Sequence, residues 1–307
     1  MRIGTRASAL ALAQARLVLD RLQAGQRGGV EIVPIVTRGD RESAGVQTSP
    51  PGEDKSRWVS ELQRALLRGE IDVAVHSAKD VPGEPVDGLA LVATPPRAGA
   101  EDALCGAASL DALAPGARVG TSSVRRVAQL LAAREDLEPV AIRGNVDTRL
   151  AKLGRGELDA IVLARAGLQR LGREDAIGAV LDPLRFLPAP GQGTLALQAR
   201  SDDASAREAL AAIGCVDSLA CLLAERALAR SLQASCDTPL GAHAVPADGS
   251  LRLRAWVGLP DGSAWASDEL HGASAEPEAL GCALAGRLRT VGAAEMLAQA
   301  AQMAAAT

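Results

Sequence analysis

Short runs of β-branched residues alternate with Ala- and Leu-rich stretches along the first two thirds of the chain, and this alternation constrains the fold more than any other feature. Such alternation predicts α/β domains with largely parallel strands, because parallel neighbours need helical crossovers between them. The expected strands are Val30–Thr37, Ile71–Val75, Leu89–Thr94, Ala117–Gly120, Val140–Arg143 and Asp159–Leu163. The expected helices are Ser8–Arg21, Trp58–Leu67, Ser123–Arg134, Asn145–Leu153 and Ala204–Ile213.

The last third of the sequence has a different pattern. A long helix over Val216–Leu232 precedes a loop with a cysteine. Two strand-like runs then flank Pro260-Asp261-Gly262-Ser263, which is typical of a hairpin turn, and an Ala-rich helix over Glu276–Ala300 closes the chain. This order predicts a small C-terminal α+β domain.

Two Pro- and Gly-rich segments, 94–99 and 187–193, are the candidate linkers between domains. Two crossings indicate that the chain leaves a first domain, builds a second and returns. The expected domains are residues 1–96 with 193–213, then 97–192, then 214–307. A hinged pair of α/β domains commonly holds its ligand in the cleft between them.

Composition excludes several classes of protein. The net charge is −4, and three Trp and one Phe are the only aromatic residues, which argues against a nucleic-acid binder. No run of eighteen apolar residues is present, so no membrane span is expected. The first residues lack an apolar signal core, which favours the cytoplasm. His76, His243 and His271 lie far apart in sequence, so no metal site is predicted.

One local design occurs three times: a strand ends, a Ser, Thr or Asn cap follows, a helix begins, and an Arg lies beside the cap. It occurs at residues 4–8, 120–126 and 143–149. Helix N-termini present unpaired N–H groups, and Arg adds a planar cation that pairs with carboxylates or phosphates. Ordinary capping would be the simpler interpretation at one site. Three such sites in one framework favour a pocket for a ligand with several anionic groups.

The segment His76-Ser77-Ala78-Lys79-Asp80-Val81-Pro82 follows a buried-looking strand, so it lies where α/β proteins bind ligands. Lys79 beside Asp80 would favour the ionised carboxylate, which stabilises a cation or moves a proton. The alternative is that Asp80 caps a helix and that His76 is a hydrogen-bonded core residue, and for His76 this alternative is favoured.

Cys236 lies in a loop of small residues, Ala234-Ser235-Cys236-Asp237-Thr238, between a helix and a strand. The other four cysteines lie in apolar or Ala-rich surroundings, as packing residues do. An accessible loop thiol is suited to act as a nucleophile, although its position alone is equally that of a spare thiol.

Seven motifs, in order and spacing, resemble porphobilinogen deaminase over residues 2 to about 260. They are Thr-Arg-x-Ser-x-Leu-Ala from Thr5, Thr-Arg-Gly-Asp from Thr37, His-Ser-x-Lys-Asp-Val-Pro from His76, Gly-Thr-Ser-Ser-x-Arg-Arg from Gly120, Arg-Gly-Asn-x-x-Thr-Arg-Leu from Arg143, Pro-Gly-Gln-Gly from Pro190 and Cys-x-x-Pro-Leu-Gly from Cys236. The resemblance implies two domains similar to type II periplasmic binding proteins and a third that carries the cofactor cysteine.

The resemblance also implies the reaction, the cofactor and the residues that serve them. Four porphobilinogen molecules lose ammonia and join into the linear tetrapyrrole hydroxymethylbilane, on a monomeric enzyme, with Asp80 as the catalytic residue. The primer is a dipyrromethane cofactor joined to Cys236 by a thioether. Further cofactor contacts are expected from Ser77, Lys79, Thr121, Ser122, Ser123, Arg125, Arg126, Arg143 and Gly144. Substrate contacts are expected from Arg6, Ser8, Lys55, Trp58, Arg149, Arg170 and Gln192.

Two other functions fit the same residues before the resemblance is considered. One is an anion-binding protein without enzymatic activity, in which Cys236 is a free thiol. The other is an enzyme such as a phosphoribosyltransferase, although no Gly-x-x-x-x-Gly-Lys phosphate loop is present.

Residues 38–57, rich in Gly, Ser, Pro and charge, are expected to form a mobile lid.

Overall fold

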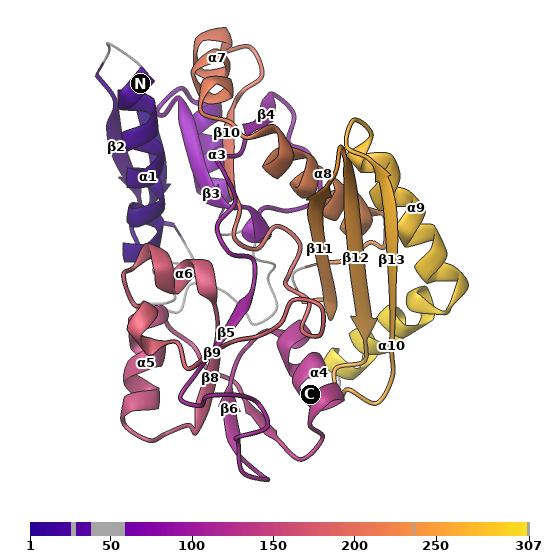
Figure 1. Ribbon diagram of the computed structural model, residues 1–307. Coiled ribbons are helices and arrows are strands. Elements are labelled where there is room, and N and C mark those ends of the chain that lie inside the picture. Colours follow the sequence, from indigo (N-terminus) through magenta and orange to yellow (C-terminus); the bar gives the residue numbers. More distant parts are fainter. Residues whose placement is uncertain (26–28, 38–58, 236, 306–307) are drawn as a thin grey trace. The chain divides into compact units, whose positions relative to one another are not determined.

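A computed structural model describes residues 1–25, 29–37, 59–235 and 237–305 (Figure 1). The chain forms two compact units: Met1–Ala98 with Thr194–Leu219, and Gly99–Gly193 with Ala220–Thr307. No helix in the described ranges is both long enough and apolar enough to span a bilayer.

The first unit is built on a five-stranded sheet of order β2-β1-β3-β10-β4. Its strands are β1 (Arg2–Arg6), β2 (Glu31–Ile35), β3 (Val73–Ser77), β4 (Leu89–Ala93) and β10 (Leu195–Arg200). β1 pairs in parallel with β2 and β3, whereas β10 is antiparallel to both β3 and β4. The helices of this unit are α1 (Ala9–Gly25), α3 (Ser60–Leu67) and α7 (Ala204–Ala212). Ile3, Val73 and Leu197 are fully buried in its core.

The second unit begins with a sheet of the same topology, order β7-β6-β8-β5-β9, in which β5 is the antiparallel insertion. Its strands are β5 (Asp102–Cys105), β6 (Arg118–Gly120), β7 (Glu138–Val140), β8 (Ala160–Ala164) and β9 (Ala179–Val180). The helical segments are α4 (Val124–Ala133), α5 (Val146–Gly154), α6 (Arg165–Arg170) and the 3-10 turn η3 (Glu174–Ala176). The shared strand order shows that residues 99–193 repeat the architecture of the first unit.

The rest of the second unit is an antiparallel sheet of β11 (Leu240–Ala247), β12 (Ser250–Gly258) and β13 (Trp265–Ala273). Its buried face packs on α8 (Val216–Ser231), α9 (Pro277–Thr290) and α10 (Ala293–Ala305), through a core that includes Leu228, Leu253 and Leu284 (Figure 1). Two α/β sheets followed by this three-stranded α+β layer confirm the predicted fold class.

Several predicted elements differ in extent from the observed ones, and two of the differences have a clear local cause. The strand expected over Val140–Arg143 is β7, Glu138–Val140, because Ser122 Oγ exchanges hydrogen bonds with the backbone of Ile142 in place of a strand partner. The helix expected over Glu276–Ala300 is two helices, α9 and α10. Gly292 separates them at a φ of 89°, a left-handed conformation that ends a helix.

Candidate active site

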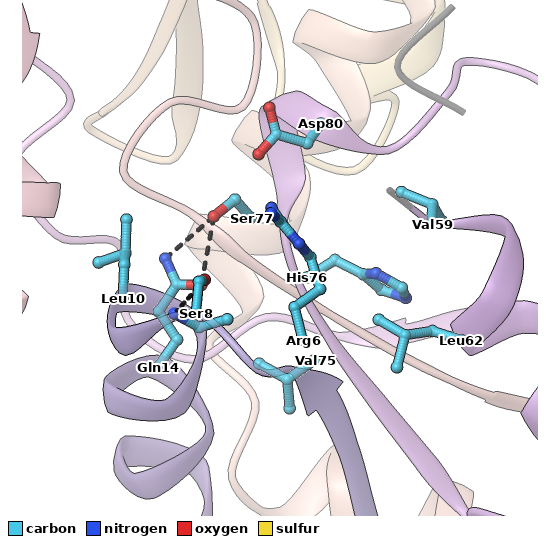
Figure 2. A pocket seen from close by; sticks show the side chains of 11 residues that line it. Arg6, Ser8, Leu10, Gln14, Val59, Leu62, Val75, His76, Ser77 and Asp80 are labelled. Carbon is cyan, nitrogen blue, oxygen red and sulfur yellow. Dashed lines mark hydrogen bonds between the residues drawn. The ribbon is translucent and has the colours of Figure 1, made fainter. Parts of the chain in front are cut away.

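Asp80 lies directly after β3, in the short 3-10 turn η2 (Ala78–Asp80). β1 runs parallel to β3, so Arg6, the last residue of β1, lies at the same edge of the sheet as Asp80. Both residues line a small cavity of about 70 Å³, together with Ser8, His76 and Ser77 (Figure 2). The structure therefore brings together the predicted residues of the first unit that it describes, with Lys79 next to Asp80 in the same turn.

Gln14 completes this cavity and was missed by the sequence analysis. Its side-chain amide donates to Ser77 Oγ at 2.9 Å, and Ser77 Oγ donates back to Gln14 Oε1 at 3.3 Å (Figure 2). Gln14 is 4% exposed, in a helix whose other buried side chains are apolar. A lone amide on the apolar face of a predicted helix was the available signal, since buried amides need partners.

His76 is buried and lines the same cavity as Asp80, and its Nε2 has no hydrogen-bond partner among the described residues. Burial lowers the pKa of His76 to about 4, against opposing effects of a hydrogen bond with Gln198 and of the charge on Asp80. The expectation of a buried histidine was right, but the expected full set of hydrogen bonds is not found. His76 is neutral at pH 7, so Asp80 is not neutralised by an imidazolium beside it.

In the second unit, the candidate residues follow the carboxyl ends of β6, β7 and β8, which are parallel neighbours. Thr121 is buried and its N–H bonds to Val140, while the exposed Ser122 links the loop to Ile142. Asn145 caps α5 by accepting from the N–H of Thr148 at 3.0 Å. Ser123 precedes α4 but makes no capping bond, so capping was correctly predicted for Asn145 and not for Ser123.

Arg125 and Arg126 are buried against Asp102, at 3% and 6% exposure, which the sequence analysis did not foresee. Arg125 reaches Asp102 Oδ2 at 2.8 Å, and Arg126 reaches Oδ1 at 2.6 Å. Burial would raise the pKa of Asp102, but the two guanidinium groups outweigh it and hold the pKa at about 2. Each arginine also donates to a carbonyl oxygen, Arg125 to Leu187 and Arg126 to Val162. The two side chains are therefore structural in this geometry, and their contact with a cofactor stays a prediction.

Arg149 and Arg170 are partly buried, and their hydrogen bonds are to backbone carbonyls. Arg149 Nε donates to Gly144 at 2.8 Å, and Arg170 donates to Gly193 at 2.6 Å. Burial lowers the pKa of Arg170 to about 10, and burial together with the charge of Arg126 lowers the pKa of Arg149. Within the described part of the chain neither has a carboxylate partner, so both are suited to bind an anion.

Two further predicted residues lie beside these arginines. Arg143 is exposed, and Gly144 has a φ of 110°, where an added Cβ would lie 2.7 Å from Thr148. A glycine is therefore required for the turn that leads into α5.

Gln192, a predicted substrate contact, is 1% exposed. Its amide donates to Ala100 at 2.6 Å and to Asp102 Oδ1 at 2.9 Å. The neighbouring Gly191 N–H donates to the buried carboxylate of Glu225 on α8 at 2.6 Å. In this geometry Gln192 holds the carboxylate that pairs with Arg125 and Arg126, and its contact with substrate stays a prediction.

Lys55, Trp58, Cys236 and the predicted lid at residues 38–57 lie outside the described residues. Beside Cys236, Ser235 N–H donates to Thr238 Oγ1 at 2.8 Å in a turn before β11. Cys105 and Cys221 are buried, and burial raises the pKa of Cys105 to about 11, so this thiol is a poor nucleophile. Cys282 is exposed, so the expectation that the other cysteines are packing residues was wrong for this one.

Two family models match the chain. Residues 1–208 match "Porphobilinogen deaminase, dipyromethane cofactor binding domain", and residues 219–290 match "Porphobilinogen deaminase, C-terminal domain". Together they cover most of the 307 residues and both described units.

Solved structures with limited similarity include the periplasmic VFT2 domain of Bordetella pertussis BvgS, with 17% identity, a TM-score of 0.40 and coverage of 69% of this chain and 86% of that chain. The periplasmic aliphatic sulphonate binding protein SsuA from Escherichia coli has 14% identity, a TM-score of 0.40 and coverage of 76% and 70%.

Proposed function

Since the chain belongs to the porphobilinogen deaminase family, we propose that Asp80 is its catalytic carboxylate and that its partly buried arginines bind the carboxylates of the pyrroles. The enzyme is a hydroxymethylbilane synthase: it condenses four porphobilinogen molecules, with loss of ammonia, into hydroxymethylbilane during tetrapyrrole biosynthesis. It works on a dipyrromethane cofactor.

The observation that carries the binding proposal is the pair Arg149 and Arg170. Each is a desolvated cation whose described hydrogen bonds are to backbone carbonyls. A buried cation is costly without a counter-charge, and a guanidinium pairs best with a planar carboxylate. Pyrroles that carry acetate and propionate groups supply that counter-charge. Exposed Arg143 and the backbone around Gly144 add donors at the same edge of the sheet.

The residues present fit a dipyrromethane cofactor for the same reason, since it carries carboxylates of the same kind. When bound, dipyrromethane supplies the pyrrole α-carbon from which the chain grows. We propose that the thiol of Cys236 anchors it, as the resemblance of its loop to the family motif implies. Cys105 and Cys221 are buried, and the exposed Cys282 is the control in the test below. Ser77, Lys79, Thr121, Ser122 and Ser123 are its proposed polar contacts. Arg125 and Arg126 are also proposed contacts of the cofactor, which would require them to reach it while they stay paired with buried Asp102.

The surroundings of Asp80 support this catalytic role. It is partly exposed on the cavity of the first unit, which neutral His76 and Arg6 also line (Figure 2). An ionised carboxylate there accepts a pyrrole N–H and stabilises the positive charge that develops as ammonia leaves. Arg6 and Ser8 are the proposed substrate contacts of this unit, with Lys55 and Trp58 from the neighbouring segment.

Asp80→Asn tests the assignment. Removing the negative charge should lower kcat by about 10²–10³, a loss of ~3–4 kcal/mol in transition-state stabilisation, with the cofactor still attached. Asp87→Asn, at an exposed position, is the matched control and should leave kcat unchanged. Asp80→Asn with more than roughly half of the parent kcat would overturn the role of this carboxylate.

Three further properties belong to the same proposal. The chain has three domains, residues 1–96 with 193–213, 97–192 and 214–307, and the three sheets support this division. The enzyme acts as a monomer, which light scattering at working concentration tests. It acts in the cytoplasm, and the four described cysteines, all free thiols, fit that reducing compartment.

A further inference from the structure

A second cavity, of about 510 Å³, lies wholly within the second unit, and none of the arginines described above lines it. One wall is the face of the three-stranded sheet opposite α8, α9 and α10, and it presents Arg254, Trp256, Trp265 and Ser267. The other walls are the end of α4 and the segments at residues 108–111 and 179–187. Its volume is typical of small-molecule sites, which span roughly 300–1,000 Å³.

The floor of this cavity is close-packed, so the cavity has a defined shape. Trp256 packs against Ala128 and Leu187. An added Cβ on Gly262, in the turn between β12 and β13, would lie 2.4 Å from the backbone nitrogen of Ala132, so the hairpin fits tightly on α4 (Figure 1). Phe186, also in the floor, is 3% exposed. The walls therefore cannot close on each other without repacking a dense interface.

The rim combines apolar exposure with unpaired positive charge. Trp265 is 54% exposed, and Val180 and Leu184 beside it are exposed as well. Eight large apolar side chains are exposed in the described chain, and three of them line this cavity. Apolar clusters of this kind commonly mark binding surfaces.

Arg134, Arg185 and Arg254 line the cavity together with two carboxylates, Asp111 and Asp182. In the described part of the chain the guanidinium groups of Arg185 and Arg254 make no ion pair or hydrogen bond, whereas Arg134 is paired with Asp136.

Arg254 and Trp256 are two residues apart on β12, so they lie on the same face of the sheet, and Ser267 lies opposite Trp256. Trp265, opposite Gly258, lies further along this face and is the exposed indole, whereas Trp256 is 6% exposed. An exposed indole and a guanidinium on one sheet face match a ligand with an aromatic ring and a carboxylate.

We propose that this cavity is a second ligand site, for an aromatic carboxylate that stacks on Trp265 and pairs with Arg254 and Arg185. Substrate and product of the enzyme belong to this chemical class, but the site uses none of the residues assigned to catalysis or to the cofactor. Its existence therefore does not depend on the roles proposed for Asp80 or Cys236. Leu187 in its floor accepts a hydrogen bond from Arg125, so Leu187 and Gln129 are avoided as test positions.

Calorimetric titration of the cofactor-loaded enzyme with naphthalene-2,6-dicarboxylate tests the site. Trp265→Ala and Arg254→Gln should each weaken binding by about tenfold or more, with porphobilinogen turnover unchanged. Trp265→Phe, which keeps an aromatic face, should retain most of the affinity. Adipate, which lacks the ring, should bind at least about tenfold more weakly than the aromatic probe.

Arg149→Gln is the control that separates this cavity from the proposed pyrrole site, and it should leave the affinity for the probe unchanged. Affinity that is unaffected by both Trp265→Ala and Arg254→Gln, or that is lost in Arg149→Gln, would show that the probe binds elsewhere. No measurable binding to the parent enzyme at millimolar probe would equally overturn the proposal.

Discussion

At the scale of single residues, burial decides which charges are structural and which are available to a ligand. Arg125 and Arg126 share a buried partner in Asp102, whereas Arg143, in the neighbouring loop, is exposed. These arginines occur in similar sequence contexts, beside a cap and a helix start. Their energetic roles differ because only the first two balance a carboxylate that is removed from water.

Arg126→Leu should therefore destabilise the protein even without cofactor. It would leave Asp102 with one cation in place of two, and breaking a buried ion pair costs about 3–5 kcal/mol. Denaturant unfolding of the cofactor-free protein measures this loss. Arg143→Leu should change the free energy of unfolding by less than about 0.5 kcal/mol. Equal stabilities of the two variants would show that the buried pair contributes nothing.

His76 should make stability depend on pH in a defined window. Its pKa is about 4 in the folded protein and 6.5 as the ordinary value, so between these values only the unfolded state takes up the proton. The contribution of His76 to the free energy of unfolding should be constant above pH 6.5. It should fall by up to ~3 kcal/mol as the pH drops towards 4. The contribution of Asp102 is lost only at lower pH, because its pKa is depressed from 3.8 to about 2.

Denaturant titrations between pH 4 and 7 follow the His76 effect. His76→Gln should flatten the pH dependence in this window, and His271→Gln, at an exposed position, should retain it. An unchanged slope in His76→Gln would mean that another group carries the dependence.

At the scale of elements, the helices and the residues at which they begin were predictable from the sequence, and fully buried strands were less so. α1, α4 and α5 begin within a residue of the predicted positions because each follows a polar cap or turn. β1, β5, β9, β10 and β11 were not among the predicted strands. β5 is buried at every position, so no alternation of polar and apolar residues marks it.

The break between α9 and α10 gives a test at this scale. Gly292→Ala should lower stability by about 1 kcal/mol, because alanine is strained at a φ of 89°. Gly286→Ala is the matched control: the position is inside α9, an added Cβ meets nothing within 4 Å, and alanine should stabilise the helix by ~0.5–1 kcal/mol. Thermal unfolding should shift in opposite directions for the two variants.

At the scale of the whole molecule, the covalent cofactor should be both an assembly product and a source of stability. Supply of porphobilinogen to the cofactor-free enzyme should add the mass of a dipyrromethane and raise Tm, because a group that contacts only the folded state stabilises it. Cys236→Ser should gain no mass, be inactive, and melt lower by roughly 2–4 °C for each kcal/mol of lost binding.

Cys282→Ser is the control for this experiment, because Cys282 is the exposed thiol among the described cysteines. It should gain the same mass and show the same Tm as the parent enzyme. A mass increment that persists in Cys236→Ser would move the anchor to another residue.

The sequence by itself determined the α/β class, the repeated loop design and the family, because motifs such as residues 76–82 and 120–126 carry chemistry in consecutive positions. Only the tertiary structure decided which side chains are paired. Arg126 bonds to Asp102, Gln14 to Ser77, and Gln192 to Asp102, and the two residues of each pair lie far apart in the sequence. Local sequence patterns reflect helix caps and helix periodicity. The free-energy cost of burying a charge depends instead on which group, distant in the sequence, is buried beside it as its partner.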